Sequence, residues 1–285
     1  MAAKMNTAQE NSLRRRRRPI NWVFTIGCLI VGFMCVVAAF PQLFTSLDPN
    51  AYDPLAMFAP PSAEHPFGCD NFGRDIFARV VYATRIDLAI GFAAMIVPFM
   101  LGTFLGLMAG YYGGRLDNLI MRVLDISMAF PFMVLAIILS AIIGNGVKIL
   151  LIASWLVAWR EYARLIRAEV MVQKNSEYVQ AAISMGYSNN RIIYRHILPN
   201  VISSAVVYAA SDVVICMMSA ASLSFLGLGV QAPTPEWGAI ISSGKDFLGT
   251  AWWITVIPGL VLAFTGWGFS MIGDGLSDML RARGK

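Results

Sequence analysis

The sequence predicts an all-α membrane protein with six transmembrane helices. Hydrophobic residues make up 57% of its 285 residues and charged residues only 14%, against roughly 25% charged in an average soluble domain. Several long stretches contain no charge at all, and a single soluble core could not bury so much apolar surface. These observations argue against a soluble enzyme and exclude a disordered chain or a disulfide-stapled secreted scaffold.

Four uncharged stretches are long enough to cross a hydrocarbon core of about 30 Å, which needs roughly 20 helical residues. They lie between Arg18 and Asp48 (29 residues), Asp87 and Arg115 (27), Asp125 and Lys148 (22), and Asp246 and Asp274 (27). A fifth span is expected over Val201–Phe225, interrupted only by Asp212. The sixth, Ile149–Trp159, has only 11 residues, so Arg160 and Glu161 would have to extend toward the interface.

These spans divide the chain into four regions. They are a basic N-terminus over 1–19, a first transmembrane helix over 20–44, an external loop over 45–84, and a five-helix core over 85–280 with a polar loop at about 170–200. Six crossings put both termini on one side of the membrane. Of the 22 Lys and Arg residues, only Arg74, Arg79, Arg85, Lys148 and Lys245 would then lie on the other side. The positive-inside rule therefore predicts that both termini and the segment Arg160–Asn200 are cytoplasmic.

Small residues recur every four positions in the second span, at Gly102, Gly106 and Gly110. Such a stripe lets two helix backbones approach closely in lipid. It predicts a tight helix–helix contact, either within the chain or with a partner.

The polar segment Glu177–Asn200 reads as two short helices separated by a break. Ser176 can cap the first helix, and Gly186 can supply the left-handed turn that ends it. The second helix is expected to stop at Leu198-Pro199-Asn200, before the fifth span. A short helix held between two spans suits docking into another protein, but an ordinary interfacial loop would have the same pattern.

Asp212 is the one acidic residue deep in a span. A charge at mid-membrane is costly, so such a residue commonly lines a pore or pairs with a partner. Asp212 is therefore a candidate for a translocation pathway that handles a cationic or amino-bearing cargo. A purely structural contact is the alternative.

The segment after residue 176 resembles a known family. Gln180-Ala181-Ala182, Gly186, Leu198 and Pro199 have the spacing of the EAA loop of binding-protein-dependent ABC transporter permeases, E-A-A, three residues, Gly, nine residues, I-x-L-P. Gln180 and His196 depart from that pattern. Tyr178–Ala182 and Arg195–Asn200 instead match the Y-V-x-A-A and R-H-I-L-P-N forms of the peptide-importer branch.

Further motifs extend this resemblance over roughly residues 20–280. They are His65–Gly68 with Asp70, Gly73-Arg74-Asp75 and Arg79, similar to H-P-F-G-T-D-x-x-G-R-D but with Cys69 where Thr is usual; Ala109–Gly114 with Asp117, Met121-Arg122, Asp125 and Ala129–Pro131; Leu223–Gly229 with Pro233, Pro235 and Trp237-Gly238; and Gly273–Gly275 with Asp278. The chain resembles the C-type subunit of dipeptide, oligopeptide, nickel and glutathione importers.

The resemblance implies a MetI-like permease fold that forms half of a translocation pathway in the bacterial inner membrane. It implies three kinds of partner: a homologous second permease in a heterodimer, two ATP-binding subunits, and an extracytoplasmic solute-binding protein. The residues it assigns to ATPase coupling are Glu177, Tyr178, Ala181, Ala182, Gly186, Leu198 and Pro199. It also adds Ser219 to Asp212 as a candidate pathway residue, because members of the family often carry an acid near this position, two helical turns after Asp212.

The chain is expected to be neither an enzyme nor a cofactor-binding protein. It has no G-x-x-x-x-G-K-[ST] phosphate loop, so ATP and Mg²⁺ would belong to the partner subunits. None of the four cysteines forms a C-x-x-C pair, and His65 and His196 fall on opposite sides of the membrane, so no metal site is expected.

Several alternatives stay open at this point. Peptides are the first choice of cargo, with nickel, glutathione or another small solute also possible. A membrane-embedded enzyme would be the rival class, since Gly273-Asp274-Gly275 superficially resembles a phosphotransferase core, but the residues that follow have the wrong spacing. A self-sufficient secondary transporter would show inverted repeats, and no clear repeat is visible.

Overall fold

The computed structural model describes residues 21–281, and this part of the chain is helical apart from loops and one isolated β-bridge between Cys69 and Asp75. The predicted basic N-terminus over 1–19 lies outside the described residues. The helices are α2 (Trp22–Ala39), α3 (Ile76–Tyr112), α4 (Gly114–Met128), α5 (Phe132–Ile143), α6 (Val147–Val157), α7 (Trp159–Lys174), α8 (Glu177–Ser184), α9 (Asn189–Arg191), α10 (Leu198–Phe225), α11 (Trp237–Gly244) and α12 (Trp253–Arg281), with short turns η1 (Pro41–Leu43), η2 (Ile192–Ile197) and η3 (Lys245–Phe247).

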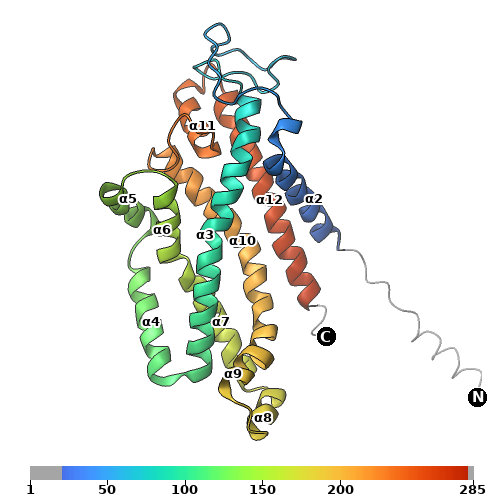
Figure 1. Cartoon of the computed structure of the whole chain (residues 1–285), viewed down its shortest axis with the longest axis vertical. Coiled ribbons are helices and arrows are strands. Elements are labelled where there is room, and N and C mark those ends of the chain that lie inside the picture. Colours follow the sequence, from blue (N-terminus) through green and yellow to red (C-terminus); the bar gives the residue numbers. More distant parts are fainter. Residues whose placement is uncertain (1–20, 282–285) are drawn as a thin grey trace, which may run out of the picture.

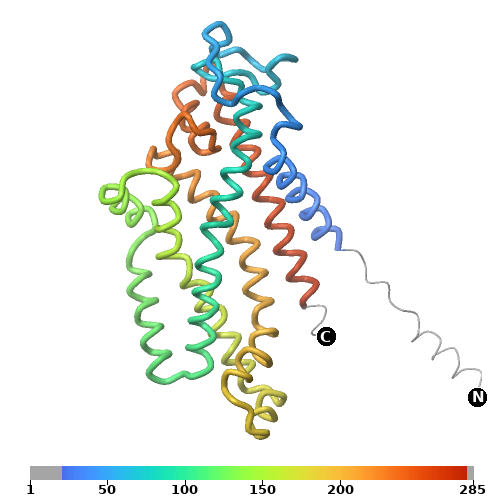
Figure 2. Tube along the Cα trace, in the orientation of Figure 1, coloured from blue at the N-terminus to red at the C-terminus, as the bar shows by residue number. Residues whose placement is uncertain are grey.

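The molecule is elongated, and its two ends differ in character (Figure 1). Helices α3, α10 and α12 run along the long axis, with α2 beside α12. The loop between α2 and α3 gathers at one end together with α11, and α8 and α9 form the opposite tip (Figures 1 and 2). The two polar pieces of the sequence therefore lie at opposite ends of the helical bundle.

The prediction of six spans is not confirmed. Within residues 21–281, four helical runs are long and apolar enough to cross a membrane: α2, α3, the run Asn189–Phe225, and α12. A fifth exists only if α4 and α5 count as one span, and these two helices are bent by 79° at the break between them. Pro131 lies at that break in an extended conformation and cannot continue the preceding helix, because it has no backbone N–H. The short span expected over Ile149–Trp159 corresponds to α6, which has 11 residues.

Helix α3 begins at Ile76, so it includes residues that the sequence analysis assigned to the external loop over 45–84. Asp75 caps this helix, since its carboxylate accepts a hydrogen bond from the backbone N–H of Ala78 at 2.6 Å. Because Arg79 and Asp87 are charged, the uncharged stretch of the sequence begins only after Asp87 and does not reveal that α3 starts at Ile76. Both side chains are buried in the fold, and Arg79 donates to the carbonyl of Pro49 at 3.1 Å.

The glycine stripe of α3 packs against α7 of the same chain. A Cβ added to Gly106 would lie 2.6 Å from the carbonyl oxygen of Ala163, and one added to Gly110 would lie 2.8 Å from the Cβ of Val170. Only glycine permits these backbones to approach so closely. The predicted contact is thus intramolecular, and it places α7, which leads into α8, firmly on the central helix.

Tryptophan side chains fasten α11 and the external loop to the bundle. Trp237, at the start of α11, donates from its backbone N–H to the carboxylate of Asp87 at 3.1 Å and from its indole to the carbonyl of Val80 at 3.2 Å. The indole of Trp253 donates to the carbonyl of Cys69 at 3.1 Å. This end of the molecule is therefore tied to α3 and α12 at several points.

Candidate coupling surface and polar cavity

The predicted short helix after residue 176 is present as α8. Ser176 occupies the N-cap position with extended backbone, and Glu177 lies in the first turn, where its charge suits the positive helix end. The Ser176 hydroxyl does not cap the helix, because it donates to the carbonyl of Gln173 at 2.6 Å. This bond instead ties the start of α8 to the end of α7.

Gly186 ends α8 in the predicted left-handed conformation, with a φ of 75°. Its N–H donates to the carbonyl of Ile183 at 2.9 Å, and the N–H of Tyr187 donates to the carbonyl of Ala182 at 3.2 Å. A Cβ added here would meet nothing within 4 Å, so the requirement for glycine comes from the backbone and not from crowding.

One face of α8 packs inward and the other is open. Val179 and Ala182 are fully buried in the same apolar cluster as the isoleucines of η2. Glu177, Gln180 and Ala181 are exposed. Of the residues assigned to coupling, Ala182 therefore supports the helix from inside, while Glu177 and Ala181 lie on its outer surface.

Tyr178 connects α8 to both neighbouring helices. Its side chain is 41% exposed, and its hydroxyl donates to the side-chain oxygen of Gln173 at 2.7 Å and accepts from the amide of Asn200 at 3.0 Å. Leu198 is half-buried and Pro199 is exposed in the first turn of α10, close to Asn200 in the chain. Three residues predicted to couple to an ATPase, Tyr178, Leu198 and Pro199, thus lie near the junction of α7, α8 and α10.

The predicted stop at Leu198-Pro199-Asn200 is wrong. The helical run continues from Asn189 through the π-helical turn η2 into α10 and ends only at Phe225. Pro199 lies directly after the π-helical turn η2, in which the N–H of Leu198 donates to the carbonyl of Ile193. As a result, the tip of the molecule is joined to its centre by one helical run.

A polar cavity of about 210 Å³ opens between α5, α6, α7 and α10. Asp212 and Ser219, the two candidate pathway residues, both line it. The other polar groups of its wall are Ser154, Arg160, Glu161 and Tyr208.

Asp212 is buried, with 3% of its surface exposed, and its carboxylate accepts a hydrogen bond from the hydroxyl of Tyr162 at 2.8 Å. The ring of Tyr162 is held edge-on between Phe99 and Tyr208. The acid is therefore fixed by a rigid aromatic support while it borders the cavity.

Arg160 and Glu161 were not predicted as cavity residues. Their charged groups lie 3.7 Å apart at the start of α7 and line the cavity. Arg160 also donates to the carbonyl of Ser127 at 2.9 Å. An adjacent pair of opposite charges directly after an apolar run of only 11 residues was the available signal.

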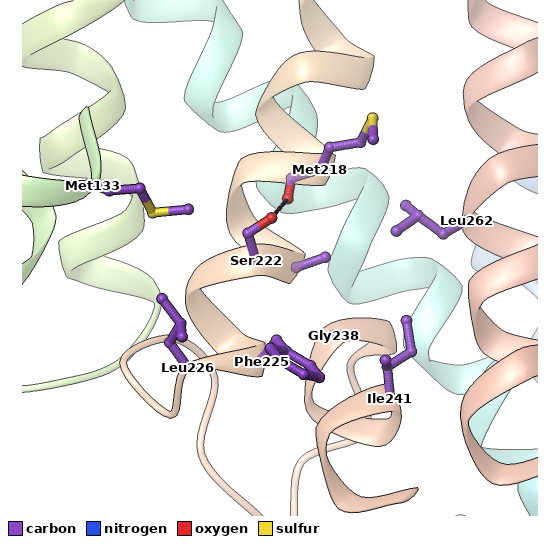
Figure 3. A pocket seen from close by; sticks show the side chains of 9 residues that line it. Met133, Met218, Ser222, Phe225, Leu226, Gly238, Ile241 and Leu262 are labelled. Atoms are coloured by element: carbon purple, nitrogen blue, oxygen red, sulfur yellow. Dashed lines mark hydrogen bonds between the residues drawn. The ribbon is translucent and has the colours of Figure 1, made fainter. Parts of the chain in front are cut away.

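A second, larger pocket of about 420 Å³ is apolar (Figure 3). Met218, Ser222 and Phe225 of α10 line it, with Ile241 of α11 and Leu262 of α12 across from them. The Ser222 hydroxyl is already satisfied, since it donates to the carbonyl of Met218 at 2.7 Å. The two candidate pathway residues, Asp212 and Ser219, therefore line the smaller cavity and not this apolar pocket.

Comparisons with known proteins agree on one family. A family model described as the binding-protein-dependent transport system inner membrane component matches residues 102–284. The chain is 42% identical over 260 residues to the dipeptide transport system permease protein DppC of Alkalihalophilus pseudofirmus, covering 91% of this chain and 86% of that protein. It is 40% identical over 253 residues to the glutathione transport system permease protein GsiD of Pectobacterium atrosepticum, covering 88% and 84%.

A solved structure has the same fold. The chain aligns with a subunit in inward-facing conformations of the MetNI methionine ABC transporter with a TM-score of 0.58 and 17% identity, covering 72% of this chain and 95% of that one. The helical architecture is thus a MetI-like permease fold. Together with the family match and the curated relatives, it shows that the chain belongs to the inner-membrane permease components of binding-protein-dependent ABC importers.

Proposed function

We propose that this chain forms half of the translocation pathway of an ATP-driven peptide importer and that α8 receives the force of ATP hydrolysis from a partner ATP-binding subunit. One observation carries the proposal: the helical run Asn189–Phe225 joins the exposed tip of the molecule at α8 to the polar cavity at Asp212. A displacement of the tip would therefore move a wall of the cavity, in the manner of rigid-body transitions between packed helices.

The open face of α10 suits a second, homologous permease. Ile215, Met218 and Phe225 are exposed along this face, at the edge of both cavities. A partner helix packed here would cover these apolar side chains and complete a pathway of which this chain supplies one wall. ATP and Mg²⁺ would be bound by the ATP-binding subunits.

We propose the orientation that goes with this function. With α8 in the cytoplasm, both termini would be cytoplasmic as well, and the loop between α2 and α3 would face outward, where a solute-binding protein would deliver the cargo. The positive-inside distribution of Lys and Arg supports this orientation.

The charges of the cavity favour a zwitterionic cargo. Asp212 and Glu161 can bind an ammonium group, and Arg160 can bind a carboxylate. Peptides carry both groups, and relatives are named as dipeptide and glutathione permeases. Glutathione, itself a zwitterionic peptide, is the second candidate. A free nickel ion fits less well, because Arg160 would repel it and no His or Cys belongs to the described lining of this cavity.

Gly186 provides the test of coupling. In Gly186→Val, a β-branched residue must adopt left-handed backbone, which costs roughly 1–2 kcal/mol and should distort the end of α8. We expect the complex with its ATP-binding subunits, reconstituted in liposomes, to retain ATP hydrolysis and lose about tenfold in uptake, the change that 1.4 kcal/mol produces.

Gly186→Asn is the matched control, since Asn tolerates left-handed backbone. It should transport at close to the wild-type rate. Normal ATP-driven uptake by Gly186→Val would contradict the assignment of α8 as the coupling element.

A further inference from the structure

Three side chains with metal-binding chemistry meet at the outer end of the molecule, away from both cavities. His65 and Cys69 come from the loop between α2 and α3, and Asp75 is the capping residue of α3. One candidate ligand atom from each lies within 4.8 Å of the others. The Nδ1 of His65 lies 2.8 Å from a carboxylate oxygen of Asp75, and Cys69 pairs with Asp75 through a backbone β-bridge.

We propose that His65, Cys69 and Asp75 bind a borderline divalent cation, of which Zn²⁺ is the best fit, and that the ion fastens the external loop to the first turn of α3. Imidazole nitrogen, thiolate sulfur and carboxylate oxygen are the ligands that Zn²⁺ takes in proteins. Bonds of about 2.0–2.3 Å in a tetrahedral site separate ligand atoms by roughly 3.3–3.6 Å. Ligand atoms as far apart as 4.8 Å would therefore have to approach by about 1.2–1.5 Å, whereas the Nδ1 of His65 and the carboxylate oxygen of Asp75, now 2.8 Å apart, would have to separate by about 0.5 Å.

The surroundings of Cys69 supply the negative field that a cation requires. Burial, Asp75 and Asp70 raise the pKa of the Cys69 thiol to about 12, with further contributions from Asp53 and Glu64. Arg74 pairs with Asp70 at 2.7 Å and so offsets that charge. A bound divalent ion would favour the deprotonated form of Cys69, because it stabilises the thiolate and the thiol proton is released to solvent.

The neighbouring hydrogen bonds hold the ligands in place and leave one position free. The second oxygen of Asp75 accepts from the N–H of Ala78 at 2.6 Å, and the carbonyl of Cys69 accepts from the indole of Trp253 at 3.1 Å. Such outer contacts orient metal ligands. His65 is the exposed member of the cluster, with 21% of its side chain accessible, so an ion can enter beside it and keep a water as fourth ligand.

The thiolate ligand would come from Cys69, the residue at which the external motif departs from the similar signature H-P-F-G-T-D. The three ligands are not spaced as a C-x-x-C motif, which explains why the sequence by itself predicts no metal site.

Cobalt(II) binding tests the proposal, because a thiolate ligand produces a sulfur-to-cobalt charge-transfer absorption that carboxylates and imidazoles do not. The full chain, carrying Cys28→Ser and Cys35→Ser to remove its exposed thiols, is titrated in nanodiscs with Co²⁺ and then with Zn²⁺. We expect one Co²⁺ per chain, a thiolate band that Zn²⁺ displaces, and a higher thermal unfolding temperature with Zn²⁺.

Cys69→Thr restores the residue of the signature and should fold, but it should lose the band and the Zn²⁺-dependent rise in unfolding temperature. Asp75→Asn keeps a capping side chain and should weaken metal binding at least about tenfold, since even changes outside the ligand set cost 10- to 100-fold. Cys216→Ser, which removes a buried cysteine elsewhere, should behave like the parent protein. The absence of a thiolate band at stoichiometric Co²⁺, or a band that persists in Cys69→Thr, would overturn the proposal.

Discussion

Asp212 lies on α10, where its carboxylate borders the polar cavity and accepts the hydroxyl of Tyr162 at 2.8 Å. A charged carboxylate within a membrane span costs free energy unless it is solvated, paired with another group or bound to a substrate. Its tyrosine partner satisfies one oxygen without neutralising the charge. The carboxylate is thus available to a cationic group in the cavity, which is the role proposed for it.

Replacing Asp212 by Asn removes the negative charge and keeps nearly the same side-chain shape. The amide oxygen can still accept from Tyr162, but the attraction for an ammonium group is lost, so we expect uptake of peptides with a free amino terminus to fall about tenfold, a loss of about 1.4 kcal/mol. The measurement is initial uptake by the reconstituted complex, alongside its ATP hydrolysis, which should be unchanged.

Tyr162→Phe serves as the comparison, because it removes the hydrogen bond and retains the carboxylate. It should lower stability by about 1 kcal/mol and affect uptake less than Asp212→Asn does. Equal uptake by the wild type and Asp212→Asn would remove Asp212 from the pathway.

At the scale of elements, the contact of α3 with α7 positions the coupling surface. The stripe Gly102, Gly106 and Gly110 brings the two backbones together, and α7 continues into α8 after a short turn. Any force on α8 therefore meets a support that is anchored on the central helix.

Gly106→Ala should weaken this support. Its added methyl group would lie 2.6 Å from the carbonyl oxygen of Ala163, so one backbone must shift, at a cost of about 1–3 kcal/mol. The thermal unfolding temperature in detergent should fall. Gly32→Ala in α2 meets nothing within 4 Å and should leave that temperature unchanged or slightly raised, because alanine favours helix. Similar behaviour of both variants would mean that the close contact does not hold the helices together.

An ion pair joins helix α4 to α7. Arg167 donates from Nε and Nη2 to the two carboxylate oxygens of Asp117, at 2.5 and 2.6 Å. Only Ile120 and Leu124 of α4 are buried, so apolar packing contributes little here.

Arg167→Lys keeps the charge but loses the two-pronged geometry, and it should destabilise the protein by about 1 kcal/mol. A double-mutant cycle of Arg167→Gln with Asp117→Asn, followed by thermal unfolding, measures the coupling between the two groups. Additive effects of the two substitutions would show that this pair does not hold α4.

At the scale of the whole molecule, α8 and the loop between α2 and α3 occupy opposite ends (Figure 1). If the bundle crosses the membrane along its long axis, these two surfaces face different compartments. One would meet the ATP-binding subunit and the other the solute-binding protein.

Cysteine labelling in intact cells tests this orientation. Ser184→Cys on α8 and Ser62→Cys in the loop introduce thiols at exposed positions, in a background with Cys28 and Cys35 replaced by Ser. We expect an impermeant maleimide to label the variant at residue 62 at once and the variant at residue 184 only after the membrane is opened. The reverse pattern would contradict the proposed topology.

Properties that depend on neighbours in the chain could be predicted from the sequence. Composition and uncharged stretches indicated a helical membrane protein, because lipid requires backbone groups to be satisfied within helices. The left-handed turn at Gly186 is a local backbone property, and the structure confirms it. The predicted number of spans was not confirmed. The length of an uncharged stretch does not show whether the helix within it is straight, and α4 and α5 are bent by 79° where they meet.

Contacts between distant residues were decided only by the tertiary structure. The sequence by itself showed a glycine stripe but not its partner α7, and it did not show that Arg160 and Glu161 line the Asp212 cavity. It also did not reveal that His65, Cys69 and Asp75 meet. The physical reason is common to all three cases: the spacing of residues determines which face of a helix or loop they share, but only packing determines what that face touches.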